Sequence, residues 1–417
     1  MTKKSRTSLW IASTYFTEGL PYMITRVLSS VFFTDMGVRE SFLGFLNFLG
    51  IPWNLKFFWA PFLDIFSTKR QWLLRMQLFI TLIILSISFL AGFADKNSSP
   101  HLLQIIAFLF IGMAFLAATN DIAIDAFYLE GLPDKSEQAA YSGLRTLAYR
   151  GAVIYTRTIL VAIAGVANWF WGFSVGAVTM GLFFLLHTKL LPILKKNEHP
   201  RQKNFEAIKQ DFIDSFRVYL AQHKIVLILI FIITYKLGDE ILFAMNTPFL
   251  MRELGVSKPQ IAWLGGFVGA FSTIAGTMLG GWWIHKQGLK KAIWPLTILM
   301  NINIAAYILL SIYHPDPNTL QGMTYIALTH AYENIAAGLG AAALTVYLMR
   351  LCDTRYKAAH FAIGTAIMSL GSTLFGGFSG IIVEKIGYTN LFILSFFAGI
   401  PSMILLFWIP FKETEKV

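Results

Sequence analysis

Residues 117–151 read AATNDIAIDAFYLEGLPDKSEQAAYSGLRTLAYRG. This stretch begins inside an apolar run, yet it carries Asp121 and Asp125, which are four residues apart and therefore share one face of a helix. A short polar turn follows, and a second apolar segment then carries Arg145 and Arg150. Ionisable groups flanked by apolar residues are costly inside a membrane, where they mark functional sites. Whether the chain spans a membrane therefore decides how these residues are interpreted.

The composition is typical of a membrane protein. The chain is 56% hydrophobic and 14% charged, and its mean hydropathy is +0.59, whereas soluble proteins are about 25% charged. A single cysteine, Cys352, excludes an intramolecular disulfide and a CxxC-type metal site. The N-terminal region is basic and then apolar, but Glu18 interrupts the apolar run and no cleavage site follows. We therefore expect a retained first spanning helix rather than a signal peptide.

Stretches of about 20 mostly apolar residues, the length that spans a bilayer, recur along the chain. Most connections are short, and the long connection over 191–222 separates two groups of six. We predict an N-terminal six-helix bundle over 1–190, a cytoplasmic linker over 191–222 and a C-terminal six-helix bundle over 223–417. The twelve predicted helices cover 8–33, 41–63, 72–93, 102–130, 139–165, 169–190, 223–250, 259–285, 291–313, 320–350, 358–384 and 389–411.

The basic residues predict the orientation. Lys and Arg gather in alternate connections, above all in 189–224, and are sparse in the others. Because basic residues concentrate on the cytoplasmic side of membrane proteins, both termini are predicted to be cytoplasmic. The net charge of +11 then follows from topology, and no nucleic-acid partner is expected.

The linker contains a segment with helical periodicity. The spacing indicates an amphipathic helix lying on the cytoplasmic membrane surface, with a solvated linker helix as the alternative. The apolar positions that define it are Phe205, Ile208, Phe212, Phe216 and Tyr219.

The two halves of the chain resemble each other. The pair Gly37-Val38 recurs as Gly255-Val256 at an offset of 218 residues, and the pair Ala139-Ala140 recurs as Ala358-Ala359 at an offset of 219. Such matches at a nearly constant offset indicate a duplication of six helices. Parallel repeats of this kind are characteristic of major facilitator transporters.

Ionisable residues avoid the interior of every third predicted helix. The third, sixth, ninth and twelfth helices carry none there, whereas most of the others carry acids or bases. Charged residues must face a cavity or a protein partner, so the helices without them can face lipid. In the major facilitator architecture these four helices are the outer supports and the other eight enclose the central cavity. We therefore predict an all-α membrane protein with the major facilitator superfamily fold, in which twelve transmembrane helices form two six-helix bundles.

Several motifs occur in register along both halves. They are TYFTEGLPY (14–22), LGIPWNLKFFWAPFLD (49–64), NDIAID (120–125), TYKLGDE (234–240), TPFL (247–250) and YENIAAGLGAAALTVYL (332–348). Together they resemble the AmpG-type muropeptide permeases. This resemblance implies proton-driven import of N-acetylglucosaminyl-anhydromuramyl peptides across the inner membrane of Gram-negative bacteria, and hence a part in peptidoglycan recycling.

Three carboxyl groups are candidates for proton coupling. Glu18 lies near mid-depth of the first helix, Asp125 lies in the cytoplasmic third of the fourth, and Glu333 lies near mid-depth of the tenth. Burial and a nearby arginine shift a carboxyl group in opposite directions, so such a group can gain and lose a proton as its surroundings change. Structural alternatives remain for each, including a pairing of Glu18 with Arg26 or Lys56. His330, one turn before Glu333, could share a proton with it.

Substrate contacts are expected from residues in both bundles. Arg150 is the best candidate for a substrate carboxylate, because a guanidinium group binds carboxylates in bidentate fashion. Tyr22 and Tyr149 could stack on sugar rings, as could Tyr15 and Trp53, with ordinary packing as the alternative for each because aromatic residues make up 15% of the chain. Lys236 and Asn334 complete the predicted set, although Lys236 could instead be neutralised by Asp239 and Glu240.

Gating is expected near the cytoplasmic side. Asp121 is predicted to pair with Arg145 as an inner gate, and Asp64 with Arg70 fits the acid-then-basic gating loop of the superfamily. Lys56 could snorkel toward the cytoplasmic interface. Glycine-rich stretches in the eighth and eleventh helices should allow close helix approach.

The function predicted from these features is secondary transport by alternating access. The expected partners are an anionic glycopeptide substrate, protons and the lipid bilayer, with no cofactor or metal, and the protein is expected to act as a monomer in the bacterial inner membrane. A permease for another bulky anionic solute, such as a siderophore or an acyl-CoA, is the alternative within this fold. A membrane-embedded enzyme or sensor is the alternative from another class, but the sequence contains no HExxH or GxSxG motif.

Overall fold

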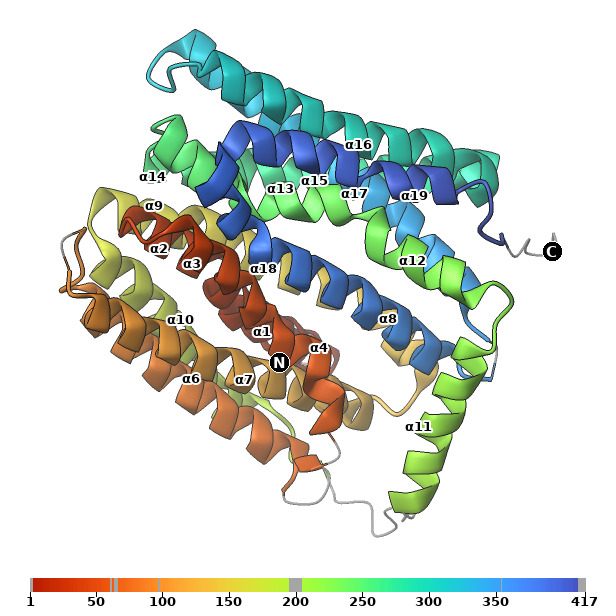
Figure 1. Cartoon of the computed structure of the whole chain (residues 1–417). Helices are drawn as coiled ribbons and strands as arrows, with labels where there is room; N and C mark the ends of the chain where they lie inside the picture. The colour runs from red at the N-terminus through yellow and green to blue at the C-terminus, as the bar shows by residue number, and fades with distance from the viewer. Residues whose placement is uncertain are drawn as a thin grey trace. The chain divides into compact units, whose positions relative to one another are not determined.

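The computed structural model of the chain describes residues 3–60, 62–63, 67–96, 98–194, 205–353 and 355–411. These residues form helices joined by turns, and no strand occurs among them (Figure 1). Eight of the described helices are long and apolar enough to cross a bilayer. The predicted all-helical membrane fold is confirmed.

The described chain divides into two compact units. The N-terminal unit contains residues 1–38, 48–196 and 256–267, and the C-terminal unit contains 39–47, 197–255 and 268–417. The units depart from the predicted bundle ranges mainly at the segments 39–47 and 256–267. The first segment is held by Glu40, whose Oε1 lies 2.8 Å from Nη1 of Arg252, and the second by Lys258, whose Nζ lies 2.8 Å from Oδ2 of Asp35.

The N-terminal unit is built from long helices and shorter pieces that continue them. Its α-helices are α1 (Lys3–Met23), α2 (Ser29–Asp35), α4 (Ile51–Leu55), α6 (Lys69–Ala91), α7 (Pro100–Gly131), α8 (Lys135–Ile154), α9 (Val161–Val166), α10 (Trp169–Leu190) and α14 (Lys258–Ala262). Wider π-helical turns occur at Ile24–Leu28, Tyr155–Leu160 and Trp263–Val268. The first of these turns follows Pro21, which lies inside α1 and lacks the N–H group that regular helical hydrogen bonding needs.

The C-terminal unit repeats this pattern. Its α-helices are α3 (Glu40–Phe45), α11 (Phe205–Leu220), α12 (Ile225–Tyr235), α13 (Leu237–Pro248), α15 (Gly269–Gln287), α16 (Leu289–Tyr313), α17 (Leu320–Leu351), α18 (Lys357–Ala398) and α19 (Ile400–Leu405). A π-helical turn at Phe249–Glu253 continues α13.

Some predicted spans are interrupted rather than continuous. The predicted helix over 41–63 consists of α3 and α4, with 3-10 segments at Leu46–Gly50 and Lys56–Phe58. The predicted helix over 223–250 breaks at Lys236, whose φ is −104° and ψ is 9°. In α18, Gly387 has φ 79° and ψ 170°, so this element is two helices joined at a turn. These breaks explain why fewer continuous spans occur among the described residues than the sequence predicts.

The duplication is visible in the backbone at one pair of turns. Gly37 has φ 74° and Gly255 has φ 71°, and each residue precedes a short helix that starts the next span. Both φ values lie in the left-handed region, which is unfavourable for residues with a Cβ atom but freely accessible to glycine. The matched residues in the two halves therefore make the same turn.

Each unit packs its own apolar core and exposes apolar side chains on its support helices. Trp10, Leu73 and Phe127 belong to the core of the N-terminal unit, and Phe231 and Leu296 to the core of the C-terminal unit. Support helices expose large apolar side chains along their length, as expected for a surface that faces lipid. These residues include Phe79, Leu82 and Phe89 on α6, Leu182 and Leu185 on α10, and Leu309 and Ile312 on α16.

The helix α11 is anchored to the start of α18. The His360 imidazole accepts a hydrogen bond at Nδ1 from the backbone N–H of Asp353 (3.1 Å), so its Nε2 donates to the carbonyl of Ser215 (3.1 Å). The ring of Tyr219 packs edge-on against His360, and burial raises the pKa of this phenol to about 12. Phe216 is half-buried, whereas the side chains of Phe205, Ile208 and Phe212 lie outside the described residues. The predicted linker helix is present, and its C-terminal half packs against the start of α18.

Replacing His360 should loosen this anchor. In His360→Ala the Ser215 carbonyl loses its donor and Tyr219 loses its ring partner, which should cost about 1–3 kcal/mol locally. Amide hydrogen exchange over 213–220 should therefore accelerate by roughly tenfold or more, with little change elsewhere. His223→Ala is the matched control, because His223 is exposed next to the same helix. Unchanged exchange in His360→Ala would show that the imidazole does not hold α11.

Candidate functional site

A partly buried cluster of acids and bases lies within the N-terminal unit. Nη2 of Arg145 on α8 donates to Oδ1 of Asp125 on α7 at 2.9 Å, and the Tyr15 hydroxyl on α1 donates to the same oxygen at 2.8 Å. One turn along α7, Asp121 forms an ion pair with Nζ of Lys56. The Arg145 guanidinium lies 4.3 Å from the ring centroid of Tyr15, so the arginine is also held by a cation–π contact.

The predicted pairing of Asp121 with Arg145 is wrong, because Arg145 pairs with Asp125 and Lys56 pairs with Asp121. Asp121 and Arg145 are each ten residues from the α7–α8 turn, about 15 Å along their helices, so depth alone favours their pairing. Side chains on a helix, however, lean toward its N-terminus. The long Arg145 side chain therefore reaches back toward the turn and meets Asp125. Lys56 takes the other aspartate rather than snorkelling to the interface.

Three carboxyl groups in this cluster face two bases. Glu18 lies within hydrogen-bonding range of Asp121 and within electrostatic range of Asp125 and Lys56. Its Oε2 is buried without a hydrogen-bond partner, and it forms no ion pair within 4.0 Å among the described residues. Lys56 and Arg145 are each already committed to an aspartate. The cluster thus has one carboxyl group more than it has bases, and Glu18 is the unmatched one.

The predicted substrate residues of this unit fall into two groups. Tyr22 packs edge-on against Trp53 with ring centroids 4.9 Å apart, and the ring of Tyr149 lies 6.4 Å from that of Tyr22. These aromatic residues are therefore brought together. Arg150, one residue beyond Tyr149, is exposed and forms no ion pair with another described residue. The arginine is thus available to an anion from outside the protein.

The predicted gating loop is only partly described. Asp64 lies outside the described residues. Arg70 caps the C-terminal end of α10, because its Nη2 donates to the carbonyl of Thr188 at 2.6 Å and its Nε donates to that of Leu191 at 3.4 Å. A cation at this end of a helix also complements the helix dipole.

In the C-terminal unit, Lys236 is occupied by neighbouring acids. Its Nζ lies 3.0 Å from Oε1 of Glu240 and 3.6 Å from Oδ2 of Asp239, and its side chain is 19% exposed. Lys236 is thus neutralised by Asp239 and Glu240, which was the alternative considered from the sequence.

A second buried acid lies deeper in the same unit. Both carboxylate oxygens of Glu333 on α17 accept hydrogen bonds from Nδ2 of Asn246 on α13, at 2.9 and 2.8 Å. The hydroxyl of Tyr307 on α16 donates to Oε2 at 2.7 Å, and Nδ1 of His330 lies 3.1 Å from the same oxygen. Glu333 is only 2% exposed. Asn246, Tyr307 and His330 thus surround the Glu333 carboxyl group, and the predicted proximity of His330 to Glu333 is present in the structure.

Sequence reasoning missed Tyr307 and Asn246. Both are neutral, so a search for ionisable residues passes over them, and Tyr307 lies on a helix that was expected to be a plain support. Their signal is a polar group in the middle of an apolar run, which in a membrane needs a partner. His187 on the support helix α10 follows the same logic, because it is fully buried and bonds to Gln77 and Ser13.

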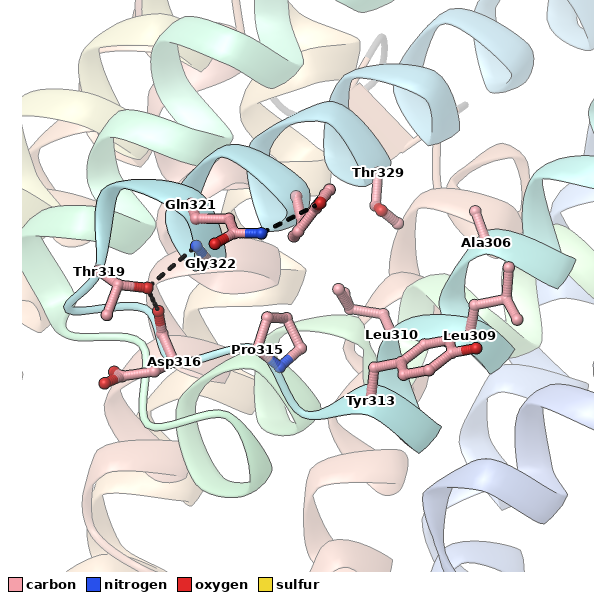
Figure 2. Close-up of a pocket in the computed structure, with 11 residues that line it drawn as sticks. Ala306, Leu309, Leu310, Tyr313, Pro315, Asp316, Thr319, Gln321, Gly322 and Thr329 are labelled. Carbon is pink, nitrogen blue, oxygen red and sulfur yellow. Dashed lines mark hydrogen bonds between the residues drawn. The ribbon is translucent and has the colours of Figure 1, made fainter.

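A separate cavity of about 620 Å³ lies between the end of α16 and the start of α17. Figure 2 shows Thr319 bonded to the backbone N–H of Gly322 at one end, with Leu309, Leu310 and Tyr313 lining the apolar side. None of the predicted site residues lines this cavity. The acid-base clusters are therefore distinct from it.

Comparison with known proteins supports the transporter interpretation. The sequence profile of the Major Facilitator Superfamily matches residues 11–315 and 228–417. The chain is similar to the anhydromuropeptide permease of Escherichia coli (strain K12), with 27% identity over 401 residues that cover 94% of this chain and 77% of the relative. It is also similar to a Rickettsia felis transporter named AmpG 4, with 26% identity over 404 residues and 94% of each chain covered. The resemblance to AmpG-type permeases is thus confirmed.

The fold is shared with solved transporters of low sequence identity. A bacterial homologue of the human lysosomal transporter Spinster, in an inward-facing and unoccupied conformation, superposes with a TM-score of 0.69 at 15% identity. That superposition covers 98% of this chain and 96% of the other. The profile match, the helical units and the span-forming helices agree. The chain belongs to the Major Facilitator Superfamily, as a multi-pass membrane transporter and not an enzyme.

Proposed function

We propose that the protein is a proton-coupled importer of N-acetylglucosaminyl-anhydromuramyl peptides in the bacterial inner membrane. The observation that carries the proton coupling is the excess of one carboxyl group over bases in the N-terminal unit, where Glu18 has a buried oxygen without a partner. A buried carboxylate that lacks a counter-charge is costly in hydrocarbon surroundings, so it gains from binding a proton. The substrate class is supported by the similarity to the anhydromuropeptide permease of Escherichia coli.

Glu18, Asp125 and Glu333 are the proton-coupling groups in this proposal. Glu18 and Glu333 lack a basic partner of fixed charge, so each can bind a proton without first losing an ion pair. Asp125 is held by Arg145 and Tyr15. Protonation of Asp125 removes the charge that holds Arg145 and frees the arginine to bind, for instance, a substrate carboxylate. Proton binding at Asp125 would thereby be linked to occupancy of the site, while Lys56 and Asp121 stay paired one turn farther from the α7–α8 turn.

The substrate residues of the proposal lie on α1, α4 and α8. The guanidinium of Arg150 binds a peptide carboxylate, and the rings of Tyr22, Trp53 and Tyr149 contact sugar rings. Asn334 and Lys236 were also predicted to bind substrate, but both are already occupied by neighbouring side chains. The proposed contacts therefore rest on the N-terminal unit.

Substrate exchange in proteoliposomes, with no ion gradient, tests the substrate class. Labelled anhydromuropeptide inside should exchange for the same compound added outside, whereas a ferric siderophore or an acyl-CoA should not support exchange. Arg150→Gln should raise the half-saturating concentration at least tenfold, because a charge-assisted hydrogen bond contributes about 1.5–3 kcal/mol. Arg75→Gln, an exposed arginine of the same unit, should leave the value unchanged. Exchange driven by the siderophore or acyl-CoA alone would replace the proposed substrate with that solute class.

A further inference from the structure

The orientation of one amide determines the protonation state of the Glu333 cluster. Nδ2 of Asn334 donates to the backbone carbonyl of His330 at 2.9 Å, and a carbonyl oxygen can only accept. Oδ1 of Asn334 lies 3.0 Å from the hydroxyl of Thr273 on α15, whose single hydrogen is shared with the carbonyl of Gly269 at 2.8 Å. The amide is therefore fixed with its NH₂ group facing His330. Asn334 is 7% exposed, so it is held in this orientation inside the C-terminal unit.

The fixed amide determines the tautomer of His330. The second hydrogen of Asn334 Nδ2 points at Nε2 of His330, which lies 3.3 Å away. Nε2 must accept this hydrogen bond, so it carries no proton, and the neutral ring has its proton on Nδ1. Nδ1 faces Oε2 of Glu333 at 3.1 Å. His330 is thus a neutral donor to the carboxylate, like Asn246 and Tyr307.

We infer that Asn334 is a positioning residue that keeps His330 neutral, so that Glu333 alone binds the proton in this cluster. This inference rests on the proposed function and deepens it. A proton from water on one side forms an O–H bond with a lone pair of the carboxylate, which becomes a neutral acid. On the other side the same bond breaks, its electron pair stays on oxygen, and the proton returns to water. His330 keeps its single proton on Nδ1 throughout this cycle, so the cluster transfers one proton.

The surrounding elements add no cation that contacts Glu333 among the described residues. The charged groups on α13 are Lys236, Asp239 and Glu240, which pair with one another. The helix α16 contributes the phenol of Tyr307, and α15 contributes the neutral Thr273. From α18, Tyr388 packs on Phe249, with ring centroids 5.7 Å apart. Asp239 also interacts electrostatically with Glu333, so the charge of the Glu333 carboxyl group depends on Asp239 as well as on His330.

Infrared difference spectroscopy of the reconstituted full-length protein tests this inference without requiring transport. The carbonyl band of the protonated acid, identified by its absence in Glu333→Gln, is followed against pH. In Asn334→Ala, Nε2 of His330 is free to take a proton, and the resulting cation stabilises the carboxylate. The midpoint at which the acid band disappears should then fall by about one pH unit. Thr277→Val, which removes a hydroxyl bonded only within α15, should leave the midpoint unchanged.

Two further variants test the role of His330, and the first of them leaves Asn334 in place, so it can be measured even if Asn334→Ala fails to fold. His330→Gln provides an amide N–H donor but no titrating ring, so its midpoint should stay within a few tenths of a unit of the parent. In Asn334→Ala/His330→Gln the shift should disappear. The inference is overturned by an unchanged midpoint in folded Asn334→Ala, by a shift that survives in the double variant, or by loss of the acid band in His330→Gln. If the acid band of Glu333 responds to pH as expected but substrate uptake does not change with the proton gradient, the proposed function would be contradicted instead.

Discussion

Glu18→Gln should abolish proton-driven accumulation of substrate while preserving substrate exchange. Glutamine has the shape of the protonated acid but cannot release a proton, and Glu18 is the carboxyl group of its cluster that no base matches. Its removal leaves the Lys56–Asp121 and Arg145–Asp125 pairs balanced. One coupled proton supports about tenfold accumulation for each pH unit of gradient, since each unit corresponds to about 1.4 kcal/mol. The variant should lose this factor entirely and reach only the external concentration.

The measurement is uptake of labelled anhydromuropeptide into proteoliposomes with an acidic exterior, compared with exchange at equal pH. Glu137→Gln is the matched control, because Glu137 lies exposed in the first turn of α8 in the same unit. It should accumulate substrate like the parent. If Glu18→Gln still accumulates substrate against its gradient, another carboxyl group carries the coupled proton.

Removing one member of the Lys56–Asp121 pair should destabilise the protein more than removing both. The Lys56 side chain is 34% exposed and that of Asp121 is 10% exposed, so loss of the lysine leaves an acid largely buried without a base. Breaking a fully buried pair costs about 3–5 kcal/mol, and partial exposure of Lys56 should bring this to about 2 kcal/mol. Lys56→Met and Asp121→Asn should each lower the thermal unfolding midpoint in detergent. The double variant should recover much of the loss, because both charges are absent.

The exposed pair Asp214–Arg217 on α11 provides the contrast. Its N–O distance is 3.7 Å and its side chains are 38% and 74% exposed, so its loss should cost less than about 0.5 kcal/mol. A Lys56–Asp121 cycle in which the single changes simply add would show that the two side chains are not energetically coupled.

Hydropathy and charge were sufficient to predict the fold. Ionisable residues such as Glu18 and Asp121 stand out in apolar runs. The absence of ionisable residues from the interior of every third predicted helix indicates which helices face lipid. The turn at Gly37 repeats at Gly255, because the same backbone geometry is needed in both halves. The helix breaks at Lys236 and near Gly50 were not predicted. Apolar periodicity continues through them, and the interruption depends on local packing.

The candidate site could be predicted as a set of residues but not as a set of contacts. Asp121 and Asp125 share a helix face, so the choice of partner for Arg145 depends on how that side chain leans, which spacing does not specify. Asn334 was predicted to bind substrate, yet it contacts His330 and Thr273 within its own unit. Asn246 and Tyr307 became visible only once α13, α16 and α17 were placed side by side.

Substrate-driven proton movement is the most direct test of proton-coupled transport. Proteoliposomes that enclose a pH-sensitive dye are held at equal internal and external pH, and anhydromuropeptide is then added outside. The account predicts that the interior acidifies as labelled substrate enters, and that Glu18→Gln exchanges substrate without this acidification. Entry of substrate into parent vesicles with no change in internal pH would contradict it.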